Sequence, residues 1–143
     1  MRQKILVFGT FDFLHIGHIY FLRQAKRCAD TVVIALARDE VVKQLKGSYP
    51  IHRERERKEL LQHVDLIDEV VYGDKTIGTY QIITRIKPTV VGIGYDQVDL
   101  YKDLQSFTKR KKISIRIIRL KPYRANERKS TLIRNIIRTA GNL

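Results

Sequence analysis

The chain has 143 residues, 43% of them hydrophobic and 8% aromatic, and a formal net charge of +13 at pH 7. This length accommodates one domain with a single core, and the hydrophobic content excludes an intrinsically disordered chain. No apolar run approaches the roughly 18 residues of a membrane span, and the single cysteine, Cys28, excludes an internal disulfide, so we expect a cytoplasmic protein.

Short apolar runs alternate with charge-rich segments along the whole chain. The middle runs are continuous and β-branched, as buried parallel strands are, and the segments between the runs are typical of helices. The predicted strands are 4–8, 31–37, 68–72, 89–93 and 113–119. The predicted helices are 17–29, 39–46, 54–63, 77–86 and 99–110, followed by a last one within 129–141. This alternation predicts an α/β fold with a doubly wound, five-stranded parallel sheet in one domain, residues 1–143.

Basic residues are concentrated near the C-terminus. Between Lys109 and Arg138 there are twelve basic residues and one acidic residue, Glu127. Three explanations fit this excess: a solvated basic face, a groove for a polyanionic small substrate, or a surface for nucleic acid. The stretch contains a single aromatic residue, Tyr123, and so lacks the interleaved aromatics that stack bases. Nucleic acid is therefore the least favoured partner.

The stretch GTFDFLHIGH, residues 9–18, lies where the first strand gives way to the first helix. Ligands of doubly wound sheets bind at the carboxyl ends of the strands, where the strand order reverses. His15 and His18 are spaced i, i+3 at the helix start, near its free amides, which predicts a phosphate site. A polyphosphate favours the charged form of imidazole, so we expect both rings to be charged donors. The alternative is that one histidine caps the helix and the other packs.

GTFDFLHIGH resembles the signature of the HIGH-motif nucleotidyltransferases, a Rossmann-like superfamily that includes cytidylyltransferases and the cores of class I aminoacyl-tRNA synthetases. Within it, the chain is most similar to the group of glycerol-3-phosphate cytidylyltransferases and archaeal FAD synthases, with further matches at RDEVVKQLKG, VDLIDEVVYGD and IKPTVVGIGYDQ. The resemblance implies attack of a substrate phosphate on the α-phosphate of a nucleoside triphosphate, with release of pyrophosphate. Catalysis of this kind rests on positioning and electrostatic stabilisation.

The resemblance also implies roles for residues in three segments. Two histidines and a lysine would hold the triphosphate and stabilise the transition state: His15, His18 and Lys46. Residues around them would line the nucleotide pocket: Gly9, Thr10, Phe11, Ile16 and Gly17. Arg57, in the helix after Lys46, would reach the phosphate of the acceptor. For Lys46 and Arg57 the alternative is a solvated helix face.

Two later segments are expected at the same edge of the sheet. In GYDQ, residues 94–97, Asp96 would accept from the ribose or the base, or else simply form a turn. GYDQ is most similar to archaeal FAD synthases, whereas the related cytidylyltransferases usually have Asp-Asp-Trp there. In the last segment, hydroxyls and a basic residue would bind the β- and γ-phosphates and an aromatic ring would pack on the base: Ser130, Thr131, Arg124 and Tyr123. Here ANERKST departs from the Arg-Thr-Glu-Gly-Ile-Ser-Thr of the cytidylyltransferases.

The pattern and the resemblance together favour an ATP-dependent nucleotidyltransferase, specifically an FMN adenylyltransferase that transfers AMP from ATP to FMN. A divalent cation, Mg²⁺ or Co²⁺, would arrive with the nucleotide, because no ligand cluster marks a metal site of the protein's own. One alternative is transfer of CMP or AMP to another phosphorylated small molecule, such as glycerol 3-phosphate or a sugar phosphate. A more distant one is an RNA-binding module on a synthetase-like core. No membrane partner is expected, and the resemblance suggests a homodimer.

Overall fold

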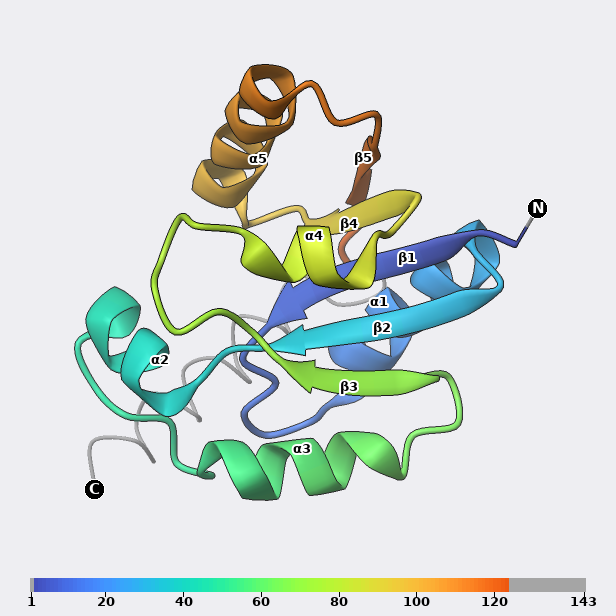
Figure 1. Cartoon of the computed structure of the whole chain (residues 1–143). Coiled ribbons are helices and arrows are strands. Elements are labelled where there is room, and N and C mark those ends of the chain that lie inside the picture. Colours follow the sequence, from blue (N-terminus) through green and yellow to red (C-terminus); the bar gives the residue numbers. More distant parts are fainter. Residues whose placement is uncertain (1, 124–143) are drawn as a thin grey trace.

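Five parallel strands form one sheet in the computed structural model, which describes residues 2–123. The strand order is β3-β2-β1-β4-β5, with all carboxyl ends at one edge (Figure 1). The strands are β1 (Lys4–Gly9), β2 (Thr31–Leu36), β3 (Glu69–Tyr72), β4 (Val90–Gly94) and β5 (Arg116–Leu120). The doubly wound α/β fold predicted from the sequence is thereby confirmed. The last predicted helix, within 129–141, lies outside the described residues.

The helices also follow the prediction, with one exception. They are α1 (Ile16–Cys28), α2 (Asp39–Lys46), α3 (Glu54–Gln62), α4 (Gln81–Ile86) and α5 (Val98–Lys111). The helix predicted at 77–86 begins only at Gln81, because Gly78 and Tyr80 adopt left-handed backbone conformations, with φ of 86° and 49°. A left-handed residue cannot be part of a right-handed helix.

β5 begins three residues later than predicted, at Arg116. Lys112, which follows α5, has a left-handed φ of 55°, and the amide of Ile113 donates to the carbonyl of Thr108. These features form the C-terminal cap of α5. Residues 113–115 therefore connect the helix to the strand instead of pairing in the sheet.

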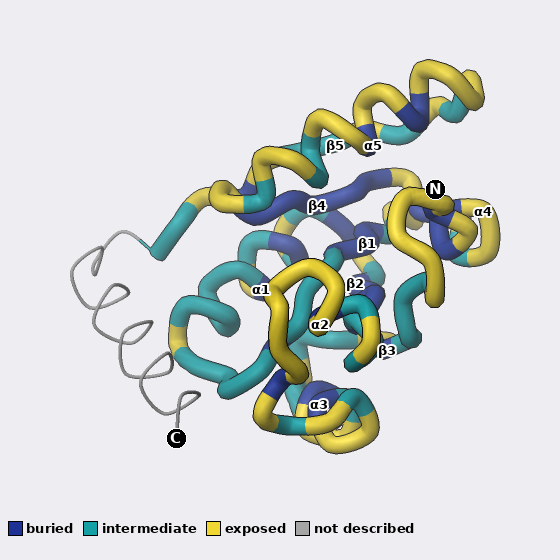
Figure 2. The backbone as a smooth tube through the Cα atoms, turned by 90° about the vertical axis from the view of Figure 1, so that its left-hand side faces the viewer, coloured by how far each residue is buried: buried dark blue, intermediate teal, exposed yellow. Residues whose placement is uncertain are grey.

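Two apolar layers bury the sheet, and alternate residues of each strand belong to opposite layers. On one face, Ile5 and Val7 pack with Leu22 of α1 and Leu61 of α3. On the other face, Leu6 packs with residues of α4 and α5, including Ile83, Leu104 and Phe107. Figure 2 shows the central strands buried between helices whose outer surfaces are exposed. Each fully buried Leu or Ile side chain contributes about 1.5–3 kcal/mol, so these layers fix the strand ends that position the site.

The strand order reverses between β1 and β4. The chain runs outward from β1 through β2 to β3, then crosses to β4 and continues to β5. The segments that leave β1 and β4 at their carboxyl ends are therefore neighbours at the switch point. α2 lies beyond the same ends of the strands (Figure 1). Among residues 2–123, no helix combines the length and apolar character needed to cross a bilayer.

Candidate functional site

The two histidines of the first motif cap the start of α1. His15 is the N-cap residue, and its Nδ1 accepts a hydrogen bond from the amide of Gly17 at 3.0 Å. His18 Nδ1 in turn accepts from the amide of His15 at 3.2 Å. The ring centroids are 4.0 Å apart. Both rings thus accept hydrogen bonds from amides at the start of the helix. Capping was the alternative expected for one of the two histidines, and the structure shows it for both.

These hydrogen bonds assign the tautomer of each neutral ring. Because Nδ1 accepts a backbone N–H in both residues, the single ring proton lies on Nε2. The pKa of His18 is lowered to about 4, chiefly by burial and in part by the neighbouring His15 and Lys46. In the nucleotide-free protein, His18 is a neutral Nε2–H donor near neutral pH. The expectation of two charged rings concerns the site with a polyphosphate bound and stays a prediction.

Stability should depend on pH through His18. Unfolded His18 takes up a proton near pH 6.5, whereas folded His18 stays neutral down to about pH 4. The unfolding free energy should then fall by about 3 kcal/mol as the pH drops from 7 to 4, and this contribution should not change above about pH 7.5. Urea unfolding at several pH values measures it. The difference between wild type and His18→Asn isolates the contribution of His18, and equal pH profiles for the two proteins would contradict the lowered pKa.

Two glycines let aromatic rings approach the motif backbone. A Cβ on Gly17 would lie 2.8 Å from Cε1 and 2.9 Å from Nδ1 of the His15 ring, and one on Gly9 would lie 2.5 Å from the Phe11 ring. Phe11 has a left-handed φ of 52° and is 6% exposed, with its ring 5.3 Å from that of His18. Phe11 therefore supports His18 from within the core. Ile16 is 47% exposed at the helix start.

Lys46, the last residue of α2, lies beside the loop that follows β1. Its Nζ donates to the Thr10 hydroxyl at 3.1 Å. Desolvation lowers the pKa of this exposed lysine, while the nearby carboxylates of Asp12 and Asp96 raise it and Arg57 lowers it. Lys46 is therefore within electrostatic range of the segments that follow β1 and β4. The structure thus brings together Thr10, His18, Lys46 and Asp96, from three separate parts of the sequence.

Among the predicted site residues within 2–123, Arg57 is the one whose placement contradicts the expected role. It was expected to reach the acceptor's phosphate, but its side chain is 0% exposed. Four of its hydrogen-bond donors are engaged by the carbonyls of Thr10, Ala37 and His52 and by the carboxylate of Asp39. A guanidinium held in this way has no surface to offer a ligand. The solvated face that was its alternative is also wrong.

The segment after β5 packs on α1. Gln24 and the backbone of Lys121 exchange two hydrogen bonds, at 2.8 and 2.9 Å. Tyr123, expected to pack on the base, lies with its ring 5.3 Å from that of Tyr20. Arg124, Ser130 and Thr131 lie outside the described residues.

Sequence reasoning missed two residues that join the segments around the site. Asp12 accepts from the amides of Ile51 and His52, at 2.7 and 3.0 Å. Gln97 bridges the switch point, because its Oε1 accepts from the Gly94 amide at 2.8 Å and its Nε2 donates to the Phe8 carbonyl at 3.2 Å. Both lie three residues after the end of a strand, β1 for Asp12 and β4 for Gln97, and this position was the available signal for them.

The loop from β1 also packs on the segment before α3. Phe13 has a left-handed φ of 56°, and its ring centroid is 5.1 Å from that of His52. Together with the hydrogen bonds of Asp12, this contact fixes the loop to residues 51–52. The loop after β1 and the segment before α3 therefore lie side by side next to the histidine motif.

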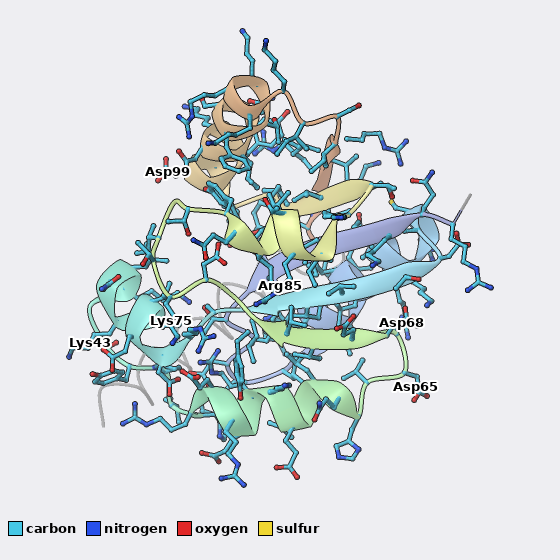
Figure 3. All side chains as sticks on the ribbon, viewed as in Figure 1. Lys43, Asp65, Asp68, Lys75, Arg85 and Asp99 are labelled. Carbon is cyan, nitrogen blue, oxygen red and sulfur yellow. The ribbon has the colours of Figure 1, made fainter. Side chains whose placement is uncertain are left out.

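Side chains of both signs lie toward the carboxyl ends of the strands. Figure 3 shows Lys43 and Lys75 there, near α2, and Asp99 in the first turn of α5, whereas Asp65 and Asp68 lie at the opposite edge. Within residues 2–123, no group of three or more His, Cys, Asp or Glu side chains is placed to hold a metal ion.

Comparison with solved structures supports the same fold. A lipopolysaccharide core biosynthesis protein from Thermoplasma volcanium superimposes with a TM-score of 0.80 and 29% identity, covering 86% of this chain and 99% of that one. Pantothenate synthetase from Thermus thermophilus gives a TM-score of 0.61 at 15% identity, covering 85% of this chain and 56% of that one, and shares the fold alone.

Curated relatives match almost the whole chain. The FAD synthase of Thermococcus sibiricus is 35% identical over 96% of this chain and 95% of its own length. The FAD synthase of Pyrococcus abyssi is 36% identical over 85% of this chain and 82% of its own length. The family model described as cytidylyltransferase-like matches residues 6–136, which include the histidine motif, Lys46 and Asp96. The chain therefore belongs to the cytidylyltransferase-like family of nucleotidyltransferases.

Proposed function

We propose that this protein is an FMN adenylyltransferase, which forms FAD and pyrophosphate from ATP and FMN, and that residues 1–143 form its single catalytic domain. The observation on which the proposal rests is the convergence of His18, Lys46 and Thr10 at the carboxyl end of β1. The FAD synthase relatives, which match nearly the full length, supply the choice of substrates. The cytoplasmic location expected from the sequence is part of the same proposal.

The proposed reaction has one bond-forming step. An oxygen of the FMN phosphate attacks the α-phosphorus of ATP, the bond from that phosphorus to the bridging oxygen of the β-phosphate breaks, and pyrophosphate leaves with the electron pair. In the transition state, negative charge is spread over the equatorial oxygens of the transferred group and develops on the leaving pyrophosphate. Donors fixed in place before the reaction stabilise this charge most effectively.

The side chains divide this work between them. His15 and His18 direct Nε2–H groups at phosphate oxygens, His18 as a neutral ring, and their caps hold the rings so that no reorientation is needed. Lys46 neutralises charge on the phosphates, and Asp96 accepts from the nucleoside. Pyrophosphate leaves without needing a proton from the protein. A neutral donor such as His18, which stabilises charge by hydrogen bonding and gives up no proton, therefore suits this transfer.

A divalent cation fits this site as part of the nucleotide. Asp12 already uses both carboxylate oxygens on backbone amides, and the described residues offer no set of three protein ligands. When bound, Mg²⁺ or Co²⁺ supplies positive charge to the triphosphate. The protein residues would then act on phosphate oxygens and not on the metal.

Pyrophosphate release tests the proposal. ATP and CTP are each combined with FMN, glycerol 3-phosphate and a sugar phosphate in the presence of Mg²⁺ or Co²⁺, and FAD is measured by chromatography. We expect release and FAD formation with ATP and FMN. Release with another acceptor alone would overturn the assignment of FMN, and release only with CTP would overturn that of ATP. His18→Asn serves as the inactive control for contaminating activity.

A further inference from the structure

Arg57 is the only wholly buried charged side chain among residues 2–123. Burying a charge is costly unless it is paired and hydrogen-bonded, and an apolar residue of similar volume often serves packing better. The guanidinium lies at the centre of a set of acceptors from different segments. It donates to the carbonyls of His52 (2.9 Å), Thr10 (2.8 Å) and Ala37 (2.8 Å), and to Asp39 Oδ1 (2.8 Å).

The segments that Arg57 joins are those that hold Lys46 in place. Thr10, whose carbonyl accepts from Arg57, also accepts from Lys46 Nζ through its hydroxyl at 3.1 Å. Asp39 is the first residue of α2 and Lys46 the last. An α-helix rises about 1.5 Å per residue and is stiff over two turns, so fixing Asp39 fixes the direction from which Lys46 arrives. Arg57 therefore holds both the acceptor of the Lys46 hydrogen bond and the start of its helix.

The return from α2 to α3 is held as well. The His52 amide donates to Asp12 Oδ1 at 3.0 Å, and its carbonyl accepts from Arg57 Nε. Residue 52 is thus fixed on both sides, once by the loop after β1 and once by α3. Residue 52, where the chain returns from α2 to α3, therefore cannot shift without breaking one of these bonds.

We propose that Arg57 is a positioning residue that sets the place of Lys46 relative to Thr10 and the histidine motif. The planar guanidinium offers donors in several fixed directions, which the single ammonium of a lysine cannot reproduce. The proposal concerns the geometry of the nucleotide site. The kinetic test of it rests on the proposed function, because that test measures AMP transfer, whereas the binding test does not.

A double-mutant cycle tests whether Arg57 acts through Lys46. Arg57→Lys should lower kcat/KM for ATP about tenfold in the wild-type background, since small displacements of a catalytic group are costly. In a Lys46→Ala background the same substitution should change kcat/KM less than about twofold, because the group to be positioned is gone. An undiminished tenfold loss in that background would overturn the proposal.

Leu61→Ala is the matched control for stability. Leu61 is fully buried on the same helix and packs in the core layer. This variant should lower Tm at least as much as Arg57→Lys, yet leave kcat/KM within about twofold where all variants are folded. A comparable loss of activity in Leu61→Ala would show that Arg57→Lys acts through stability alone and would overturn the proposal.

Two further measurements keep the test decisive. If Arg57→Lys does not fold, Asp39→Asn weakens the same anchor at constant size, and its smaller loss should also vanish without Lys46. If wild type forms no FAD, the proposed function fails, but calorimetric ATP binding still tests Arg57. Arg57→Lys should then weaken ATP binding only when Lys46 is present, and equal weakening in both backgrounds would overturn the proposal.

Discussion

Replacing His18 with asparagine should reduce turnover about a hundredfold or more and leave the protein folded. Asparagine places its amide oxygen near the position of Nδ1, so it retains an acceptor for the His15 amide, which His18 Nδ1 accepts at 3.2 Å. It has no counterpart of Nε2. The loss therefore reports the Nε2–H donor that we propose faces the phosphates, separately from the cap.

Two variants accompany this measurement. His18→Ala should lose the same activity and in addition about 1 kcal/mol of stability, because the cap is removed as well. His63→Asn changes an exposed histidine at the end of α3 and should keep turnover within about twofold. Steady-state rates of pyrophosphate release measure all three. Activity of His18→Asn within a few-fold of wild type would remove His18 from the transition state.

Gly17→Ala should also reduce turnover about a hundredfold, through the position of the His15 ring. The new Cβ would lie 2.8 Å from Cε1 of that ring, a distance that forces the ring out of its capping place. Stability should change little, because the lost cap, worth about 1 kcal/mol, is offset by the higher helix propensity of alanine. An inactive protein with a nearly unchanged Tm is the expected result.

Gly78→Ala should show the opposite result, a lower stability with unchanged turnover. Gly78 has a φ of 86° with open space around it, so a side chain there is strained without a collision. We expect the unfolding free energy to fall by about 1–2 kcal/mol, with a lower Tm, and turnover to stay as in wild type. If Gly17→Ala instead resembles Gly78→Ala, the ring contact has no role in turnover.

The strands and most helices could be predicted from the sequence because their signals are local. Apolar β-branched runs mark β1, β2 and β4 without reference to the rest of the chain. The start of α4 could not be predicted, since the left-handed conformation of Tyr80 follows from packing and not from its residue type. Its hydroxyl is hydrogen-bonded to Asp103 of α5, and its ring lies 5.0 Å from that of Phe107, contacts between segments distant in the sequence.

The candidate site shows the same division. The histidine motif and Lys46 could be identified because they form short patterns, and the resemblance gave them roles. The hydrogen bonds of Arg57 go to carbonyls from three other segments, and the sequence around Arg57 does not reveal these partners. Its burial alone had a local signal, because Arg57 is four residues before buried Leu61 and so lies on the same face of α3.

The strained loop after β1 has a consequence for how the nucleotide binds. Phe11 and Phe13 both adopt left-handed conformations, at a cost of about 1–2 kcal/mol each. The packing of Phe11 in the core and of Phe13 against His52 keeps them there. The loop is therefore ordered by folding, before any ligand arrives. The amide of His15, which donates to His18 Nδ1, should accordingly exchange slowly with solvent in the free protein. We expect ATP to meet a rigid surface, with association limited by diffusion and charge and not by the closing of a loop.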